Sequence, residues 1–484
     1  MNQRNFVKTS WPALIILAVY LLVGGLYVVY TPLWQAPDEP AHYNYVRSLA
    51  QNQGFPIMEP GDYDQDYLSR LTSEGFPDTL PIAPLRYEGH QPPLYYLLAT
   101  PIYWITGGAV RALRIFSLLL GGIGVAMVFL ILRESVPEKP GVAWLGGGLV
   151  AFIPQYIAIM ASINNDALTV ALLWLWLWLG LMYLRGKMSP WVLGLVAGLL
   201  LLTKTTGYGV LPLTLLVLYL RYRRNRMSPQ WAGRQLVALL LPALMLGAVW
   251  WSRNIIVYGW PDVMGLQRHD MVVTGQPMTV DWIAQYGLAP FILDAGRTTF
   301  RSFWGQFGWM GVVLDIRIYQ GLLILTALTA YGAIWHLSRV IRGSLDTRQR
   351  EAFILLGSAA FITFAMFAFY NLRYVQHQGR YLFPALPFLA LAAATGWQRL
   401  LEFKFAVITA LALAPVALLL AVGGLIVGEM PTWPLAMLGA TLIGLPVMAR
   451  ISERGYALLI GATLVGMAGL DLLCLFGFIV PILS

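Results

Sequence analysis

The sequence predicts an all-α polytopic membrane protein, and three observations support this fold class. Hydrophobic residues make up 58% of the 484 residues and charged residues only 11%, whereas a soluble globular chain carries about 25% charged residues. The mean hydropathy is +0.66, and apolar runs recur from Trp11 to Leu483. This composition excludes a cytosolic enzyme and a disordered protein. Cys474 is the only cysteine, which excludes an intramolecular disulfide.

About thirteen apolar runs approach the length needed to cross a bilayer, which is about 20 mostly apolar residues. The first run follows basic residues and has no small-residue cleavage site after it, so we expect a retained anchor rather than a signal peptide. We therefore expect one transmembrane module over residues 1–484. The predicted spans are 11–31, 112–132, 141–162, 167–184, 189–204, 208–221, 235–252, 318–338, 352–371, 382–398, 405–428, 433–449 and 456–482.

The segment 94–107 decides the orientation of everything after it, because it is apolar but short and interrupted by Pro101. If it lies in the interface and the N-terminus is cytoplasmic, the inside loops hold more than half of the 32 basic residues and about a quarter of the 23 acidic ones. This distribution agrees with the positive-inside rule. We therefore expect interfacial helices in a long first extracytoplasmic loop, residues 32–111, and a second such loop, residues 253–317. The net charge of +9 comes from basic residues concentrated in the cytoplasmic loops and not from a single basic surface, so we do not expect nucleic acid as a partner.

The first loop opens with an acidic pair at the membrane boundary. Asp38 and Glu39 follow the first span within a few residues, and His42 comes shortly after them. Such carboxylates are candidates for acid–base chemistry, with Asp38 as base and Glu39 as a second catalytic residue. Glu39, His42 and the later Asp166 are also candidate ligands of a divalent metal ion, Mg²⁺, Mn²⁺ or Zn²⁺. The alternative for Asp38 and for Asp166 is a helix N-cap.

Basic side chains come from separate spans and are all expected at the same outer face. Lys204 ends an outward-going span, Arg253 begins the second loop, and Arg380 precedes Tyr381 where the chain re-enters the membrane. Intramembrane charges usually mark function or find partners, and a guanidinium binds phosphate in a bidentate manner. These residues therefore predict an anion site, for which a phosphate group is a candidate. Snorkelling of Lys204 and contact with lipid headgroups are the alternatives.

The end of the first loop adds further polar candidates. Arg86, His90 and Gln91 stand just before the pair Pro92 and Pro93. A proline pair ends one conformation and starts the next helix. We therefore expect these three side chains near the interface, where they could bind substrate.

Together, these segments resemble the GT-C superfamily of membrane glycosyltransferases, in particular the protein O-mannosyltransferases and the lipid A aminoarabinose transferase. The shared features are the acidic pair after the first span, the long first outer loop, the PPLYY segment, the lysine of LLTKTT and the segment GRYLFPALP. The segments PDEPAH, GHQPPLYY, NNDALT and QGRYLFPALP are closer still to an uncharacterised branch of this superfamily.

The resemblance implies a sugar donor linked to polyprenyl phosphate, bound from the plasma (inner) membrane and its lipids. In this hypothesis Asp38 accepts the proton of an acceptor hydroxyl, and the anomeric carbon inverts. Lys204, Arg253 and Arg380 stabilise the leaving phosphate. The acceptor is a lipid, a glycan or a protein. Two other functions stay open, which are a lipid-linked polysaccharide polymerase or ligase and a lipid or sugar transporter (flippase).

Overall fold

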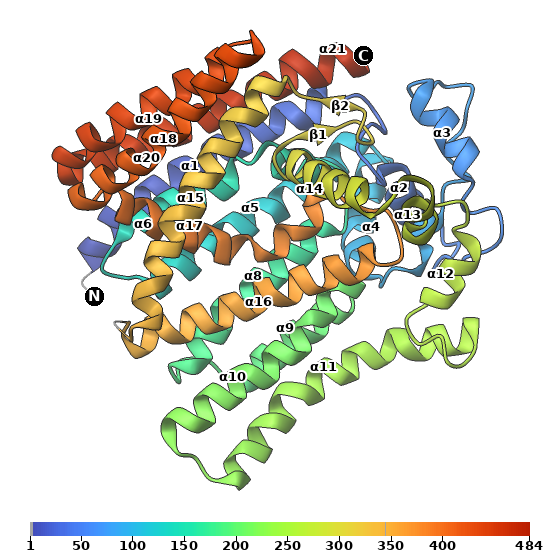
Figure 1. Ribbon diagram of the computed structural model, residues 1–484. Coiled ribbons are helices and arrows are strands. Elements are labelled where there is room, and N and C mark those ends of the chain that lie inside the picture. Colours follow the sequence, from blue (N-terminus) through green and yellow to red (C-terminus); the bar gives the residue numbers. More distant parts are fainter. Residues whose placement is uncertain (1–2, 344) are drawn as a thin grey trace.

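The computed structural model describes residues 3–343 and 345–484 of the chain. Most of the described residues are helical, and one small hairpin pairs β1 (Gln306–Phe307) with β2 (Val312–Val313). Figure 1 shows long helices packed side by side, with shorter helices and the hairpin gathered at one end. We call this end, formed by residues 31–111 and 259–315, the loop end.

The predicted apolar runs all fall on helices. The first two coincide with α1 (Gln3–Tyr30) and α5 (Val110–Ser135). The others correspond to α6 (Pro140–Ala151) with α7 (Pro154–Met160), α8 (Asp166–Leu184), α9 (Pro190–Leu201), α10 (Val210–Asn225), α11 (Pro229–Tyr258), α15 (Ile316–Ile341), α16 (Thr347–Asn371), α17 (Leu386–Leu400), α18 (Phe403–Val427), α19 (Thr432–Arg450) and α20 (Ser452–Cys474), the last continued by η4 (Leu475–Ile479) and α21 (Val480–Leu483).

Short elements make up the loop end and two breaks between long helices. The first loop contains α2 (Glu39–Ala50), α3 (Gln65–Ser73), η1 (Tyr87–His90) and α4 (Leu94–Thr106), and the second contains α12 (Leu266–Val272), α13 (Thr279–Tyr286), α14 (Leu288–Trp304) and the hairpin. Two 3₁₀ segments precede long helices, which are η2 (Thr205–Gly209) before α10 and η3 (Gly379–Ala385) before α17.

The polytopic all-α class is confirmed, whereas the number of spans stays a prediction. Among the described helices, nine are long and apolar enough to cross a membrane, and the α6–α7 pair, bent by 63°, makes a tenth if it is one span. The remaining candidates α9, α10 and α17 have 12, 16 and 15 residues. Helix α4 has 13 residues, which is too short to cross alone because a span takes about 20 residues.

Helix α8 lies in the protein interior, unlike other helices that are equally apolar on every side. In the apolar stretch of α8, 78% of the residues are buried, whereas the corresponding shares in α18 and α19 are 11% and 17%. A helix that is apolar all round must be covered by protein or by lipid. Around α8 the protein supplies that cover, with Trp174 and Trp176 fully buried. The first residue of α8, Asp166, therefore stands on a well-packed helix.

Candidate active site

An ion pair between Asp38 and Arg380 joins the first loop to a segment 342 residues later. Asp38 precedes α2 and has a left-handed backbone, with φ of 68°, a conformation that aspartate tolerates better than most residues. One of its carboxylate oxygens accepts from the Arg380 guanidinium. The other, Oδ1, accepts from the Tyr87 hydroxyl at 2.9 Å. Both oxygens of Asp38 are thus hydrogen-bonded.

A close backbone approach at Gly379 brings Arg380 to this position. A Cβ at Gly379 would lie 2.3 Å from the backbone nitrogen of Phe303 on α14. The backbone N–H of Gly379 also donates to Ser302 Oγ at 2.7 Å. Only glycine leaves room for this contact, so the residue before Arg380 fixes η3 against α14.

A second ion pair, between Lys204 and Asp166, lies beside the first. Lys204 Nζ donates to Asp166 Oδ1 at 2.6 Å. Lys204 directly precedes η2, and Asp166 begins α8 with its backbone N–H bonded to Asn164 Oδ1 at 2.8 Å. Arg380 and Asp166 also interact electrostatically. We therefore call Asp38, Arg380, Lys204 and Asp166 the charged cluster.

The surroundings of Asp38 keep its carboxylate charged. Burial by itself raises the pKa of Asp38, but the Arg380 guanidinium and the hydrogen bonds from Arg380 and Tyr87 hold the pKa below its usual value. His42, on the next turn of the chain, is buried, and this burial lowers its pKa to about 3. Its Nδ1 lies 2.9 Å from the Tyr96 hydroxyl oxygen. His42 is therefore neutral at physiological pH.

The site also contains a carboxylate, Glu88, that the sequence reasoning did not single out. Glu88 lies on η1 beside Tyr87, the residue that bonds Asp38. Burial and the negative charge of Asp38 raise the pKa of Glu88 to about 7. Its position between Arg86 and His90, where the chain returns to the membrane, was the available signal.

Several polar atoms around the charged cluster are buried without a hydrogen-bond partner among the described residues. Buried polar groups normally have partners, so a local concentration of free ones is typical of a ligand site. Two of them belong to the Arg380 guanidinium, which uses only part of its donor capacity on Asp38. The set comprises Arg380 Nε and Nη1, Glu88 Oε2, Gln91 Oε1, Asn164 Nδ2 and Asn165 Oδ1.

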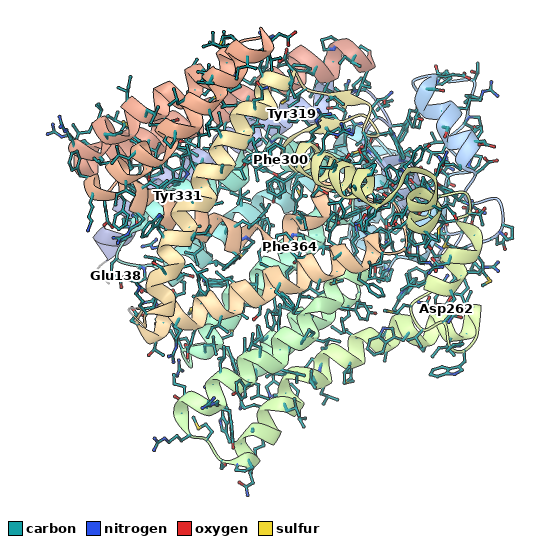
Figure 2. All side chains as sticks on the ribbon, in the orientation of Figure 1. Glu138, Asp262, Phe300, Tyr319, Tyr331 and Phe364 are labelled. Atoms are coloured by element: carbon teal, nitrogen blue, oxygen red, sulfur yellow. The ribbon has the colours of Figure 1, made fainter. Side chains whose placement is uncertain are left out.

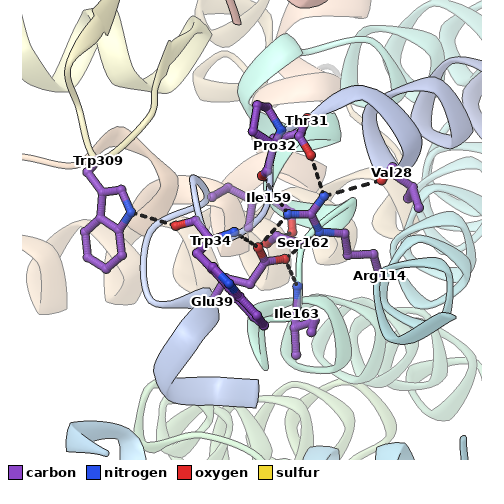
Figure 3. Close-up of polar contacts among 10 residues, drawn as sticks. All are labelled: Val28, Thr31, Pro32, Trp34, Glu39, Arg114, Ile159, Ser162, Ile163 and Trp309. Carbon is purple, nitrogen blue, oxygen red and sulfur yellow. Dashed lines mark hydrogen bonds and ion pairs between the residues drawn. The ribbon is translucent and has the colours of Figure 1, made fainter. Parts of the chain in front are cut away.

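Glu39, in contrast, is held away from the charged cluster by Arg114 of α5 (Figure 3). Arg114 donates to Glu39 Oε1 at 2.7 Å and to Oε2 at 2.6 Å, and both side chains are fully buried. The same carboxylate accepts from the backbone N–H groups of Trp34 at 3.2 Å and Ile163 at 3.1 Å. The remaining donors of Arg114 reach the carbonyls of Val28, Thr31 and Pro32. We call Glu39 and Arg114 with these backbone groups the Glu39 clamp.

The clamp corrects two expectations for Glu39. Its saturated carboxylate leaves no free oxygen for catalysis or for a metal ion. Among the described residues, no three His, Cys, Asp or Glu side chains are arranged to hold a metal, and Asp166 is paired with Lys204. Glu39, His42 and Asp166 therefore do not fit the metal site expected for them.

Of the other predicted binding residues, some join the charged cluster and others do not. Tyr381 does, since the Arg380 guanidinium lies 5.3 Å from its ring centre. His90 is buried beside the cluster, with its ring 4.4 Å from that of His269. Arg86 instead pairs with Asp62 at 2.7 Å.

Arg253 also lies away from the cluster. Its guanidinium lies over the rings of Trp250 and Tyr258, at 4.7 and 5.0 Å, and donates to the carbonyl of Pro56. Arg253 thus joins the end of α11 to the first loop, and the phosphate-binding role expected for it has no support in its contacts.

The residues that follow Arg380 in the chain help to line an apolar cavity of about 770 Å³. Leu382 and Leu386, which follow Arg380 in the chain, belong to its lining, together with residues of α6, α14, α15 and α16. Phe300 on α14 and Phe364 on α16, both in the central region of Figure 2, are part of the same wall. Phe303 lines the cavity and also contacts Gly379. The buried Arg380 is thus followed, two residues later, by the wall of an apolar cavity.

The fold defines a class, which is a polytopic all-α membrane protein with a GT-C-like fold. The family described as dolichyl-phosphate-mannose-protein mannosyltransferase matches residues 90–251, about a third of the chain. This match and the fold confirm the resemblance to the GT-C glycosyltransferases that the motifs predicted. No curated protein matches the chain.

Solved structures with a similar fold include ArnT from Cupriavidus metallidurans. Its form bound to undecaprenyl phosphate has a TM-score of 0.53 and 15% identity, over 97% of this chain and 77% of that one. Its apo form has a TM-score of 0.50 and 16% identity over the same shares. The apo oligosaccharyltransferase of Archaeoglobus fulgidus has a TM-score of 0.44 and 15% identity, over 90% of this chain and 56% of that one.

Proposed function

We propose that the protein transfers a sugar from a polyprenyl-phosphate-linked donor to an acceptor hydroxyl, with inversion at the anomeric carbon. The observation that carries this proposal is the position of Arg380. Within the described part of the chain, its guanidinium has buried donors without a partner, and the lining of the apolar cavity begins two residues further along, at Leu382. A lipid phosphate needs both features, a donor group for its charge and an apolar space for its chain.

The charged cluster supplies what the departure of a phosphate requires. Negative charge builds up on the phosphate oxygens as the bond to the sugar breaks, and preorganised cations in a water-poor site stabilise such charge. Arg380 and Lys204 are the cations in reach, each already oriented by a carboxylate. Asp38 is the base that the sequence predicts, and it lies in contact with Arg380.

Two further observations support the lipid donor and the sidedness. The similar ArnT structure is described as bound to undecaprenyl phosphate. The charged cluster also lies at the loop end, whereas basic loops such as that between α10 and α11 lie at the opposite end in Figure 1. By the positive-inside rule, the N-terminus is cytoplasmic and the site faces the extracytoplasmic side of the plasma (inner) membrane.

The test is donor-dependent release of polyprenyl phosphate by the purified protein in lipid nanodiscs. The donors are undecaprenyl-phosphate-linked hexoses and pentoses, and the acceptors are a membrane lipid extract, short glycans and a Ser/Thr-containing peptide. We expect release of undecaprenyl phosphate with at least one pair. Movement of intact donor between leaflets without release would instead indicate a flippase, and transfer of a lipid-linked glycan chain would indicate a polymerase or ligase.

The variant Arg380→Ala should bind undecaprenyl phosphate about 10- to 100-fold more weakly. A hydrogen bond to a charged group contributes about 1.5–3 kcal/mol, and about 1.4 kcal/mol corresponds to a tenfold change in affinity. Binding is measured by titration of undecaprenyl phosphate in nanodiscs. Arg297→Ala is the control, because Arg297 makes an exposed pair with Asp294 on α14. Equal weakening in both variants would remove the phosphate-binding role of Arg380.

A further inference from the structure

The carboxylates at the loop end differ in how much of their hydrogen-bonding capacity is used. Asp38 bonds Arg380 and Tyr87, Asp166 bonds Lys204, and Glu39 is saturated by its clamp. Glu88 makes no salt bridge within the described residues, and its Oε2 is buried without a partner. Burial raises the pKa of the same carboxyl group, and the Gln91 side chain lowers it by a smaller amount. Glu88 therefore has a free oxygen in a buried setting.

The short η1 turn that carries Glu88 also contacts the charged cluster. Residue 87 on the same 3₁₀ turn bonds Asp38, and the cluster cations act on Glu88 electrostatically. Glu88 is therefore a buried carboxylate with a free oxygen that interacts electrostatically with both cations, and such a group is suited to accept the proton of a hydroxyl that approaches the donor. The titratable and charged groups that surround Glu88 are Asp38, Tyr87, Tyr96, Lys204, Tyr370 and Arg380.

We propose that Glu88 accepts the proton of the acceptor hydroxyl, while Asp38 remains a permanent anion that holds Arg380 in place. This inference rests on the proposed glycosyl transfer. In the step, the acceptor oxygen forms a bond to the anomeric carbon, and the bond from that carbon to the phosphate oxygen breaks. The electron pair of the broken bond leaves with the polyprenyl phosphate. The hydroxyl proton moves to Glu88, which later releases it to solvent.

The two carboxylates are suited to these different roles. A general base works best when its pKa is near the working pH, and the pKa of Glu88 is raised to about 7 by burial and by Asp38. The pKa of Asp38 is below its usual value, and both of its oxygens are engaged. Asp38 is therefore the weaker base and the better fixed counter-ion.

The test is the pH dependence of undecaprenyl phosphate release by wild type, Glu88→Gln and Asp38→Asn. The active form of Glu88 is the carboxylate, so wild-type activity should be present above about pH 7 and fall as the pH drops below it. In Glu88→Gln the rate should fall about 100-fold or more, since general base catalysis contributes about 10²–10⁴-fold. The residual rate of Glu88→Gln should no longer show the inflection near pH 7 that the titration of Glu88 gives in wild type. Asp38→Asn should also be slow, but with an inflection shifted to lower pH because a nearby negative charge is gone.

The controls separate catalysis from folding. Glu74→Gln removes a carboxylate of the same loop that makes an exposed pair with Arg70, and it should match wild type. Glu88→Gln should bind undecaprenyl phosphate like wild type and unfold at the same temperature in detergent. Loss of that binding or of folding in Glu88→Gln would mean a structural role and overturn the inference.

Two further results would also overturn the role inferred for Glu88. The first leaves the proposed glycosyl transfer intact, and the second overturns it as well. If Glu88→Gln keeps the wild-type rate and inflection, Glu88 is not the base, and the proposed transfer is untouched. If wild type releases no undecaprenyl phosphate with any donor, the proposed function fails and this inference fails with it.

Discussion

Two neighbouring residues, Asp38 and Glu39, anchor two acidic sites of opposite character. In the Glu39 clamp every carboxylate oxygen is bonded and the arginine donors reach three backbone carbonyls. In the charged cluster, Arg380 and its surroundings retain buried polar atoms that have no partner among the residues described by the structure. Free polar atoms in the interior cost free energy, so the clamp has the chemistry of a framework and the cluster has that of a ligand site.

The difference teaches that burial of a charged residue does not by itself indicate function. Both arginines are buried, Arg114 at 1% and Arg380 at 6% exposure. They differ in their hydrogen-bond partners. Arg114 bonds a carboxylate and three backbone carbonyls, whereas Arg380 bonds a carboxylate and keeps donors without a partner among the described residues. The clamp also joins the start of α2 to the turn before Asp166 through Ile163, so it fixes the spacing of the two acidic residues of the cluster.

The largest expected effect comes from breaking the clamp with Arg114→Ala. Removing one partner of a buried ion pair costs about 3–5 kcal/mol, because the other charge stays buried and unpaired. We expect the free energy of unfolding to fall by that amount, measured by thermal or denaturant unfolding in detergent. Arg70→Ala, which removes an exposed pair with Glu74, should show no measurable change. A stable Arg114→Ala protein would break the distinction between framework and site.

A smaller and more local effect is expected for Gly379→Ala. The added methyl group would lie 2.3 Å from the Phe303 nitrogen, and overpacking of this kind costs about 1–3 kcal/mol. Relief of the clash moves η3 and with it Arg380, so undecaprenyl phosphate binding should weaken more than stability does. Gly439→Ala is the matched control, since a Cβ there meets no atom within 4 Å. Unchanged phosphate binding in Gly379→Ala would separate Arg380 from the ligand site.

The smallest effect is expected for His42→Gln, which probes the border between the two sites. The hydrogen bond to Tyr96 is lost, at a cost of about 1 kcal/mol. His42, with a pKa of about 3, is already neutral between pH 5 and pH 8, so the inflection near pH 7 should persist in the rate profile of the variant. Disappearance of the inflection would assign the titration to His42 instead of Glu88.

The helices were predictable because long apolar runs leave the chain few alternatives in a membrane. The break in the run at 141–162 also had a visible signal, because α7 begins at Pro154 and a proline inside a helix removes a backbone hydrogen bond and bends or ends the helix. The size of the bend, 63°, could not be read from the run. The cluster members Lys204 and Arg380 were predictable as charges at membrane depth. Their pairing with particular carboxylates depends on contacts between distant segments, which one sequence does not reveal.

The signal in the sequence differs between Arg114, Glu88 and Arg253. Arg114 lies inside the predicted span 112–132, so its intramembrane charge was a visible signal, and Glu39 was visible as an acidic partner. Glu88 offered less, since its raised pKa comes from burial and from a charge 50 residues earlier in the chain. Arg253 had its aromatic neighbours Trp250 and Tyr258 in the same helix, which favours a packing role.

The left-handed backbone at Asp38 limits what can replace it. Outside glycine, asparagine and aspartate, this conformation costs about 1–2 kcal/mol per residue. Asp38→Glu should therefore destabilise the folded protein through the backbone conformation alone, whatever contacts the longer side chain makes. Asp38→Asn keeps the side-chain shape and the tolerance for this backbone conformation, and it removes the negative charge. Asp38→Ala would add backbone strain to the loss of charge, so its effect could not be assigned to the charge alone.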